Sequence, residues 1–286
     1  MFPYVEDYDG YAVKRLMLEN VDILGYMSLG YLAIVWKGPT VVRRLNGETN
    51  RVSNSEYLRY AIIVWNLLLS TFSFFGMIVV VPAFVSRISQ RGILRALCDN
   101  NDDMFYRSSS GFWIGMFVLS KVPELMDTMF LLLQGKTPPF LHWYHHVTVL
   151  IFSWHTYCDH ISTMVLFAAM NLTVHFIMYF YFAMCACGFK KTMRKFAPFI
   201  TILQILQMVV GSLVTIYSAY EVYMTPVEVK EGGGITPPGC HVSKANARMG
   251  VMMYMSYLYL FSDMFLNSHV RSKKPVANPT ASGKKS

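Results

Sequence analysis

Three histidines have a spacing that could support chemistry inside a membrane. His142, His145 and His146 lie at positions i, i+3 and i+4, so in a helix they project from one face. They open the apolar run 140–157, which is typical of a membrane helix. Imidazoles are costly at the edge of a hydrocarbon layer, so we expect them to face a protein interior or an aqueous cavity. The alternative is an interfacial anchor at a helix end.

A second polar group precedes the histidines. Lys121, Glu124 and Thr128 lie at i, i+3 and i+7, with Asp127 beside them. A charged side chain at mid-bilayer costs about 2.5–3.5 kcal/mol, so these groups must pair with one another or line a polar cavity. The alternative is a purely structural pair of a lysine and an acid. The short link 134–139 makes this helix an antiparallel neighbour of the histidine helix, which places the two groups at similar depth.

Two further helices contribute polar side chains. His175 is followed at i+4 by Tyr179, and Thr201, Gln204 and Gln207 are spaced by three on one helix face. Buried glutamines need hydrogen-bond partners. His175 could be a core histidine bonded to a carbonyl, and the glutamines could be bonds between helices. Together, the four polar stripes predict one intramembrane site.

The elements that position these residues follow from composition. The 286 residues are 54% hydrophobic and 15% charged, whereas a soluble domain carries nearer a quarter of charged residues. We expect an all-α polytopic membrane protein, because a span needs about 20 apolar residues. The expected transmembrane helices, seven in number, cover residues 17–36, 57–85, 111–133, 140–157, 161–186, 198–222 and 247–268. They form one domain over 1–270, and 271–286 is a disordered basic tail.

The distribution of Lys and Arg predicts the orientation. These cations are more numerous on the cytosolic side when the N-terminus is lumenal and the C-terminus cytosolic. The connection between the fifth and sixth spans is then a basic cytosolic loop. Its cations are Lys190, Lys191, Arg194 and Lys195.

The same orientation predicts a disulfide. Cys98 and Cys240 both lie in lumenal loops, where oxidising conditions preserve disulfides, so we expect them to pair. Cys158 is also lumenal, but its very short link leaves it less free to meet a partner. Cys185 and Cys187 lie on the reducing side and should be free thiols. The cysteines have no zinc-ligand spacing, and no metal is expected.

These motifs resemble those of the ELO-type fatty acid elongases, the 3-ketoacyl-CoA synthases of the endoplasmic reticulum. The family's K-x-x-E-x-x-D-T, H-x-x-H-H, H-x-x-M-Y-x-Y-Y and T-x-x-Q-x-x-Q appear here at 121–128, 142–146, 175–182 and 201–207. The resemblance covers roughly residues 20 to 270. Phe182 departs from it, because the family motif has tyrosine there. The stretches 140–146, 188–190 and 194–197 look most like the branch that acts on saturated and monounsaturated chains.

The resemblance implies a fold and a reaction. Six of the seven helices would form a barrel around an acyl tunnel. Acyl-CoA would acylate His145, malonyl-CoA would lose CO2, and its carbanion would attack the acyl group to give a 3-ketoacyl-CoA. This is covalent catalysis with CoA thioesters as substrates and no cofactor. Remaining roles fall to the other site residues: catalysis to His142, His146, His175 and Asp127; substrate binding to Lys121, Glu124, Thr128, Tyr179, Gln204 and Gln207; and CoA phosphates to Lys190, Lys191, Arg194 and Lys195.

The expected surroundings follow from this reaction. The protein would act in the membrane of the endoplasmic reticulum, in contact with membrane lipid. Its partners would be the ketoacyl-CoA reductase, the dehydratase and the enoyl reductase of the elongation cycle, and no nucleic acid is expected.

Two other classes of protein share some of these features. Membrane di-iron desaturases also carry histidine boxes, but they gather about eight histidines, whereas only His142, His145, His146 and His175 cluster here. A receptor or transporter could use Lys121 and Glu124 as an ion relay. That class leaves the histidine box unexplained.

Overall fold

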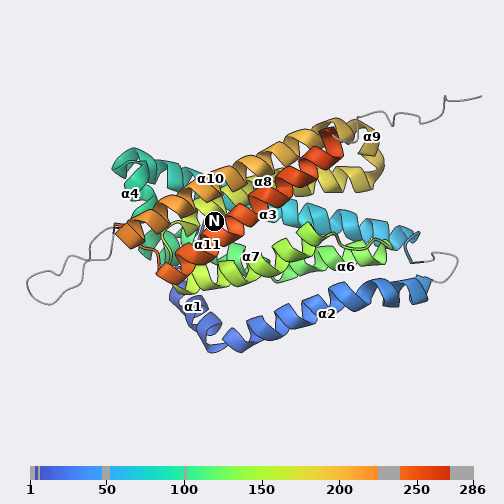
Figure 1. The fold of residues 1–286 in the computed structure, drawn as a ribbon, viewed down its shortest axis with the longest axis horizontal. Coiled ribbons are helices and arrows are strands. Elements are labelled where there is room, and N and C mark those ends of the chain that lie inside the picture. Colours follow the sequence, from blue (N-terminus) through green and yellow to red (C-terminus); the bar gives the residue numbers. More distant parts are fainter. Residues whose placement is uncertain (1–3, 6, 47–51, 100–101, 225–238, 271–286) are drawn as a thin grey trace, which may run out of the picture.

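The computed structural model describes residues 4–5, 7–46, 52–99, 102–224 and 239–270. Throughout these residues the regular secondary structure is helical, and the long helices run side by side in one bundle (Figure 1). The elements in chain order are α1 (Gly10–Glu19), α2 (Val21–Asn46), α3 (Glu56–Arg91), α4 (Ile93–Cys98), η1 (Asp103–Arg107), α5 (Ser109–Ser120), η2 (Pro123–Leu125), α6 (Met126–Leu133), α7 (Phe140–Cys158), α8 (Met164–Met184), η3 (Cys185–Phe189), α9 (Lys190–Met193), η4 (Arg194–Phe196), α10 (Ala197–Met224), α11 (Lys244–Phe265) and η5 (Leu266–Val270).

The predicted spans fall on helical segments, and some of these can cross a membrane. Within the described ranges, the stretches Glu56–Arg91 and Met164–Met224 are long and apolar enough to do so. A third is added if the bent pair α1 and α2 counts as one span. The fold therefore fits a multi-pass membrane protein. The seven crossings and the six-helix barrel stay predictions, and the predicted tail at 271–286 lies outside the described residues.

The first predicted span, 17–36, differs from the structure at both ends. The chain bends by 67° between α1 and α2. Asn20 lies at this bend, and its side-chain amide donates to the carbonyl of Leu16 at 2.7 Å. Such a local side-chain bond competes with continuation of a helix. At the other end α2 continues past Pro39 to Asn46, and Arg43 and Arg44 in its last turn interact favourably with the helix dipole.

The predicted span 111–133 is helical but broken. Helix α5 ends at Ser120, the short 3-10 segment η2 follows, and α6 begins at Met126. Pro123 lacks an N–H and clashes with the preceding turn of an α-helix. The backbone of Lys121 and Val122 instead bonds three residues back, at 3.2 Å each. This break places Lys121 and Glu124 at the junction between α5 and α6.

Two helix pairs form most of the bundle, α3 with α8 and α10 with α11. Helices α10 and α11 approach closely at Gly211, where a Cβ atom would collide with the ring of Tyr254. The chain turns from α8 towards α10 at Gly188, whose φ of 105° suits glycine. This turn and α9 lie at one end of the bundle, and α4 lies at the other (Figure 1).

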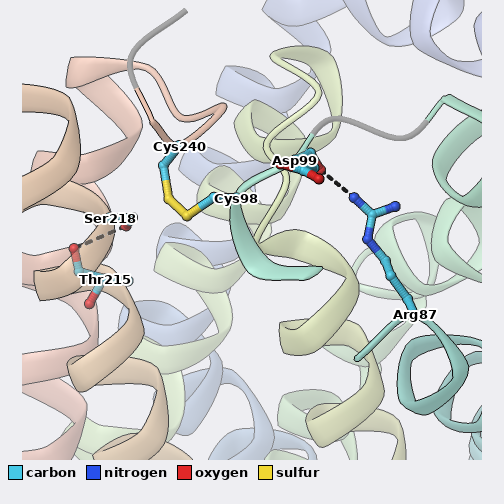
Figure 2. The surroundings of a disulfide bond; sticks show 6 residues. All are labelled: Arg87, Cys98, Asp99, Thr215, Ser218 and Cys240. Atoms are coloured by element: carbon cyan, nitrogen blue, oxygen red, sulfur yellow. Dashed lines mark hydrogen bonds between the residues drawn. A yellow bond between two sulfur atoms is a disulfide. The ribbon is translucent and has the colours of Figure 1, made fainter. Parts of the chain in front are cut away.

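A disulfide joins Cys98 to Cys240 at the α4 end of the bundle (Figure 2). The pair is the one predicted from the loop positions. The backbone beside the disulfide is also hydrogen-bonded. The N–H of His241 donates to the carbonyl of Cys98 at 2.9 Å, and the N–H of Ser162 donates to the carbonyl of His241 at 3.1 Å. The bridge therefore connects α4 to the entry of α11, and the backbone hydrogen bond of Ser162 attaches the link between α7 and α8 to the same point.

Candidate active site

Lys121 and Glu124 form a buried ion pair at the break between α5 and α6. Their side chains are 2% and 4% exposed, and Lys121 Nζ lies 2.8 Å from Glu124 Oε1. Ser120 Oγ donates to the same oxygen at 2.8 Å, and Lys121 Nζ also donates to Asn171 Oδ1 at 3.1 Å. Each charge thus has an opposite charge and a further polar partner, which buried charges require.

Asp127, on α6, is held by donors from two other helices. The indole N–H of Trp65 on α3 donates to one carboxylate oxygen at 2.7 Å, and the hydroxyl of Tyr179 on α8 donates to the other at 2.7 Å. Bonds from a donor to a carboxylate are among the stronger hydrogen bonds in proteins. Asp127 therefore fixes the position of Tyr179, and His175 packs edge-on against that ring, with centroids 5.2 Å apart.

Thr128 links α6 to the histidine box and to α2. Its hydroxyl lies 2.9 Å from Nε2 of His142 and 2.8 Å from the hydroxyl of Tyr31. The ring of His146 packs against that of His142, with centroids 4.5 Å apart, and is itself buried. The predicted neighbourhood of α6 and α7 is therefore confirmed by the bond between Thr128 and His142.

His145 faces a narrow cavity among α5, α7, α8, α10 and α11. The cavity has a volume of about 30 Å³ and is mostly apolar, with polar atoms from His145, Asn171 and Gln207 among its lining. His142 and His146 are absent from its lining. On α7 the lining residues His145, Val149 and Ser153 are spaced by four, so they form one stripe along the helix. The hydroxyl of Tyr257 donates to the carbonyl of His145 at 3.2 Å, which joins α11 to this turn.

The glutamines and His175 lie close to the same centre but play different parts. Gln207 is buried and lines the cavity, whereas the amide of Gln204 contacts the sulfur of Met178 at 3.3 Å. Thr201 bonds the carbonyl of Ala197 in its own helix. The four predicted polar stripes therefore lie close together. Hydrogen bonds join α6 to α7 and to α8, and Gln207 on α10 lines the same cavity as His145 on α7.

The predicted basic residues lie apart from this centre. Lys190 and Lys191 are on α9, Arg194 and Lys195 are in η4, and all four side chains are exposed. They surround the turn at the end of the bundle opposite α4 (Figure 1). We find no hydrogen bond or ion pair between them and the buried site in the part of the chain that the structure describes.

Several residues of the site were not predicted. An asparagine such as Asn171 inside an apolar span is itself a signal of a polar site, and it could have been found. Trp65 and Tyr31 were missed because their polar atoms belong to aromatic rings in apolar helices, and only the packing of α2 and α3 reveals their hydrogen bonds. Tyr257 was recognisable only as one of several tyrosines in its helix.

Taken together, these features define a class. Over its described residues the protein is an all-helical membrane protein in which one histidine, His145, and two amides, Asn171 and Gln207, line a small apolar cavity beside the buried carboxylates and the other histidines.

Comparison with known proteins identifies the family. Residues 16–277 match the ELO family, described as the GNS1/SUR4 family. The chain is 87% identical over 285 residues to fatty acid elongase 2 of Trypanosoma cruzi, covering 100% of both proteins. It is 57% identical over 274 residues to fatty acid elongase 2 of Trypanosoma brucei brucei, covering 96% of this chain and 98% of the relative. It is 48% identical over 288 residues to fatty acid elongase 1 of Trypanosoma cruzi, covering 96% of each. The chain belongs to the ELO family of fatty acid elongases.

Proposed function

We propose that this elongase catalyses the condensing step of fatty acid elongation. Acyl-CoA and malonyl-CoA give a 3-ketoacyl-CoA that is two carbons longer, with release of CO2 and CoA. In this scheme it is an acyltransferase of the 3-oxoacyl-CoA synthase class. The route is ping-pong, with an acyl group held on His145 between the two half-reactions.

The observation that carries the proposal is the position of His145 on the apolar cavity. His142 is engaged by Thr128 and His146 is buried behind it, so neither has the same access. The cavity has room for about one water molecule in this structure, so an acyl chain would enter by moving apart its apolar walls, among them Val149, Phe152 and Met208. The thioester carbonyl at its end then lies beside an imidazole.

Acylation begins with attack of a His145 ring nitrogen on the thioester carbonyl. The C–S bond breaks, and the sulfur of CoA leaves with the proton that the imidazole loses. His146, whose ring centroid lies 5.6 Å from that of His145, can pass this proton. Gln207 and Asn171, both on the cavity wall, can donate to the oxyanion that develops.

Condensation follows when malonyl-CoA replaces CoA. Its C–C bond to the carboxylate breaks, CO2 leaves, and the electron pair remains as an enolate. The enolate carbon attacks the acyl carbonyl, the C–N bond to His145 breaks, and the imidazole regains a proton. Asp127 and His175 position the site through Tyr179. The pair Lys121–Glu124 holds Asn171 of the cavity wall, because Lys121 donates to it. Thr128 orients His142, and Gln204 contacts Met178.

The cellular context is part of the proposal. The reaction would take place in the membrane of the endoplasmic reticulum, with the N-terminus lumenal and the basic turn in the cytosol, where CoA thioesters are supplied. The ketoacyl-CoA product would pass to a ketoacyl-CoA reductase, then to a dehydratase and an enoyl reductase.

The test is a half-reaction with acyl-CoA in the absence of malonyl-CoA. We expect release of CoA and a mass gain of one acyl group on the peptide that contains His145. His145→Ala should lose both signals. His155→Gln, on the same helix but outside the cavity lining, should retain them.

The half-reaction separates the nucleophile from the overall fold. A His145→Ala protein that unfolds at the wild-type temperature but neither releases CoA nor gains mass supports the acyl-histidine. Full condensing activity in His145→Ala would contradict it. A mass gain on another histidine would reassign the nucleophile.

A further inference from the structure

A large groove lies at the α4 end of the bundle, away from the histidine site. Its volume is about 600 Å³, and it is formed by α3, η1 and the start of α5. The residues from α3 are Ile78, Val79, Pro82, Ala83, Ser86, Arg87, Gln90 and Arg91. Their spacing of four along the chain makes them one face of the helix. The face changes in character along its length, being apolar up to Ala83 and polar from Ser86.

Arg87 is the charged group of this groove, and its bonding is incomplete. The residue is 6% exposed, and one NH2 group donates to the carbonyl of Asp99 at 2.6 Å (Figure 2). Its Nε and Nη1 atoms have no hydrogen-bond partner among the residues that the structure describes. Two unsatisfied donors on a buried cation cost considerable free energy, so they point to an acceptor that carries negative charge.

The start of α5 faces the same groove. Helix α5 has 12 residues, and its N-cap Ser108 makes no side-chain capping bond within the described chain. The first N–H groups of a helix lack intrahelical partners and carry partial positive charge, which favours an anion. Arg91 adds a second cation at the rim, because its 3.4 Å ion pair with Asp99 is exposed and weak. Asp103, an exposed carboxylate, also lines the groove and sets a limit on its net positive charge.

We propose that this groove binds a membrane phospholipid. The phosphate lies near the start of α5 and accepts hydrogen bonds from Arg87 Nε and Nη1, which are closed off in this structure and become available when the side chain turns towards the groove. An acyl chain follows the apolar turns of α3. The predicted span of α3 ends at residue 85, which places the change from apolar to polar lining at the level of lipid headgroups. The shared chemistry is a phosphate group, and the apolar half of the groove favours a lipid over free phosphate.

The experiment compares thermal unfolding of the delipidated, detergent-solubilised full chain with different additives. The probes are phosphatidylglycerol, diacylglycerol with the same acyl chains, and sodium phosphate. We expect phosphatidylglycerol to raise Tm and the other two to have little effect. Phospholipid that remains bound after purification should also be detectable by mass spectrometry of the intact protein.

Three variants locate the effect. Arg87→Gln removes the cation, and Ala83→Phe fills the apolar part of the groove without changing charge, so both should lose most of the lipid-induced rise in Tm. Arg95→Gln is the matched control, because Arg95 is an exposed cation at the same end that does not line the groove, and it should retain the rise. If Arg87→Gln fails to fold, Ala83→Phe decides. An equal rise in wild type and Ala83→Phe would overturn the proposal, and a full rise with sodium phosphate alone would overturn the assignment to a lipid.

Discussion

At the scale of single residues, the ion pair of Lys121 and Glu124 shows how this chain tolerates charge in an apolar bundle. Both side chains are nearly inaccessible, and Asn171 and Ser120 satisfy further hydrogen-bonding groups. A buried pair often adds little net stability, because desolvation offsets the attraction. Breaking it is costly, because one charge then remains buried alone.

We predict that Lys121→Met destabilises the protein by roughly 3–5 kcal/mol, the range for breaking a buried pair. The double variant Lys121→Met with Glu124→Gln should recover much of this loss, because no net charge remains. Thermal unfolding in detergent measures both effects. A single variant as stable as wild type would contradict the buried pair, and recovered stability without recovered activity would show that the charges also serve catalysis.

Residue types and spacing predicted much of the site, because a polar residue in an apolar span must find a partner. The bonds of Thr128 with His142 and of Asp127 with Tyr179 follow from the predicted convergence. Trp65 and Tyr31 could not be predicted, since their contacts depend on which helices become neighbours. Spacing alone also could not tell which histidine faces the cavity, since all three share one face of α7.

At the scale of elements, the chain turns between α8 and α10 through Gly188, α9 and η4. This basic turn carries the exposed cations Lys190, Lys191, Arg194 and Lys195. The positive-inside rule alone would place cations there. The proposed reaction gives a second reason, because the phosphates of CoA remain outside the apolar cavity while the thioester enters it. If the cations bind CoA phosphates, removing them raises KM, whereas a purely topological role leaves KM unchanged.

Replacing the four cations of the basic turn by glutamine should raise KM for both acyl-CoA and malonyl-CoA. An exposed ion pair contributes about 0.2–1 kcal/mol. Four pairs near the lower end of that range give about 1.4 kcal/mol together, which corresponds to a roughly tenfold rise in KM. The salt dependence of KM should weaken at the same time. Neutralising Arg43 and Arg44 in the last turn of α2 is the control for a general loss of positive charge. An unchanged KM in the basic-turn variant would leave only the topological role.

The elements also show where sequence reasoning about helices has limits. The apolar stretches of the sequence predicted where each helix lies, but each predicted helix was ended at the first charged residue. The predicted span 17–36, for example, stops before Lys37, whereas α2 continues to Asn46. Helices continue past such residues when cations suit the C-terminal dipole. Pro123 was visible in the sequence, but whether it kinks or divides a helix depends on packing around it.

At the scale of the whole molecule, the two ends of the bundle differ in chemistry. The disulfide and the proposed lipid groove lie at the α4 end, and the basic turn lies at the other. An oxidising compartment at the first end and a cytosol at the second would account for both features. The disulfide and the distribution of cations thus support the same orientation by separate physical arguments.

The last prediction concerns the bridge between Cys98 and Cys240, which are separated by 142 positions. Closing so long a loop stabilises a soluble chain by up to about 5 kcal/mol in the chain-entropy model, and less here because the membrane already restrains the unfolded chain. Replacing both cysteines by alanine should therefore lower Tm. Condensing activity at low temperature should persist, because the bridge lies at the opposite end from the basic turn and outside the cavity lining.

Cys158 and Cys187 provide controls, because both are free thiols in the structure and their replacement removes no crosslink. Peptide mapping without reduction should recover the peptides of Cys98 and Cys240 joined. If both thiols are alkylated in the unreduced protein, the bridge is absent from the native molecule. The argument for a lumenal N-terminus would then rest on the cations alone.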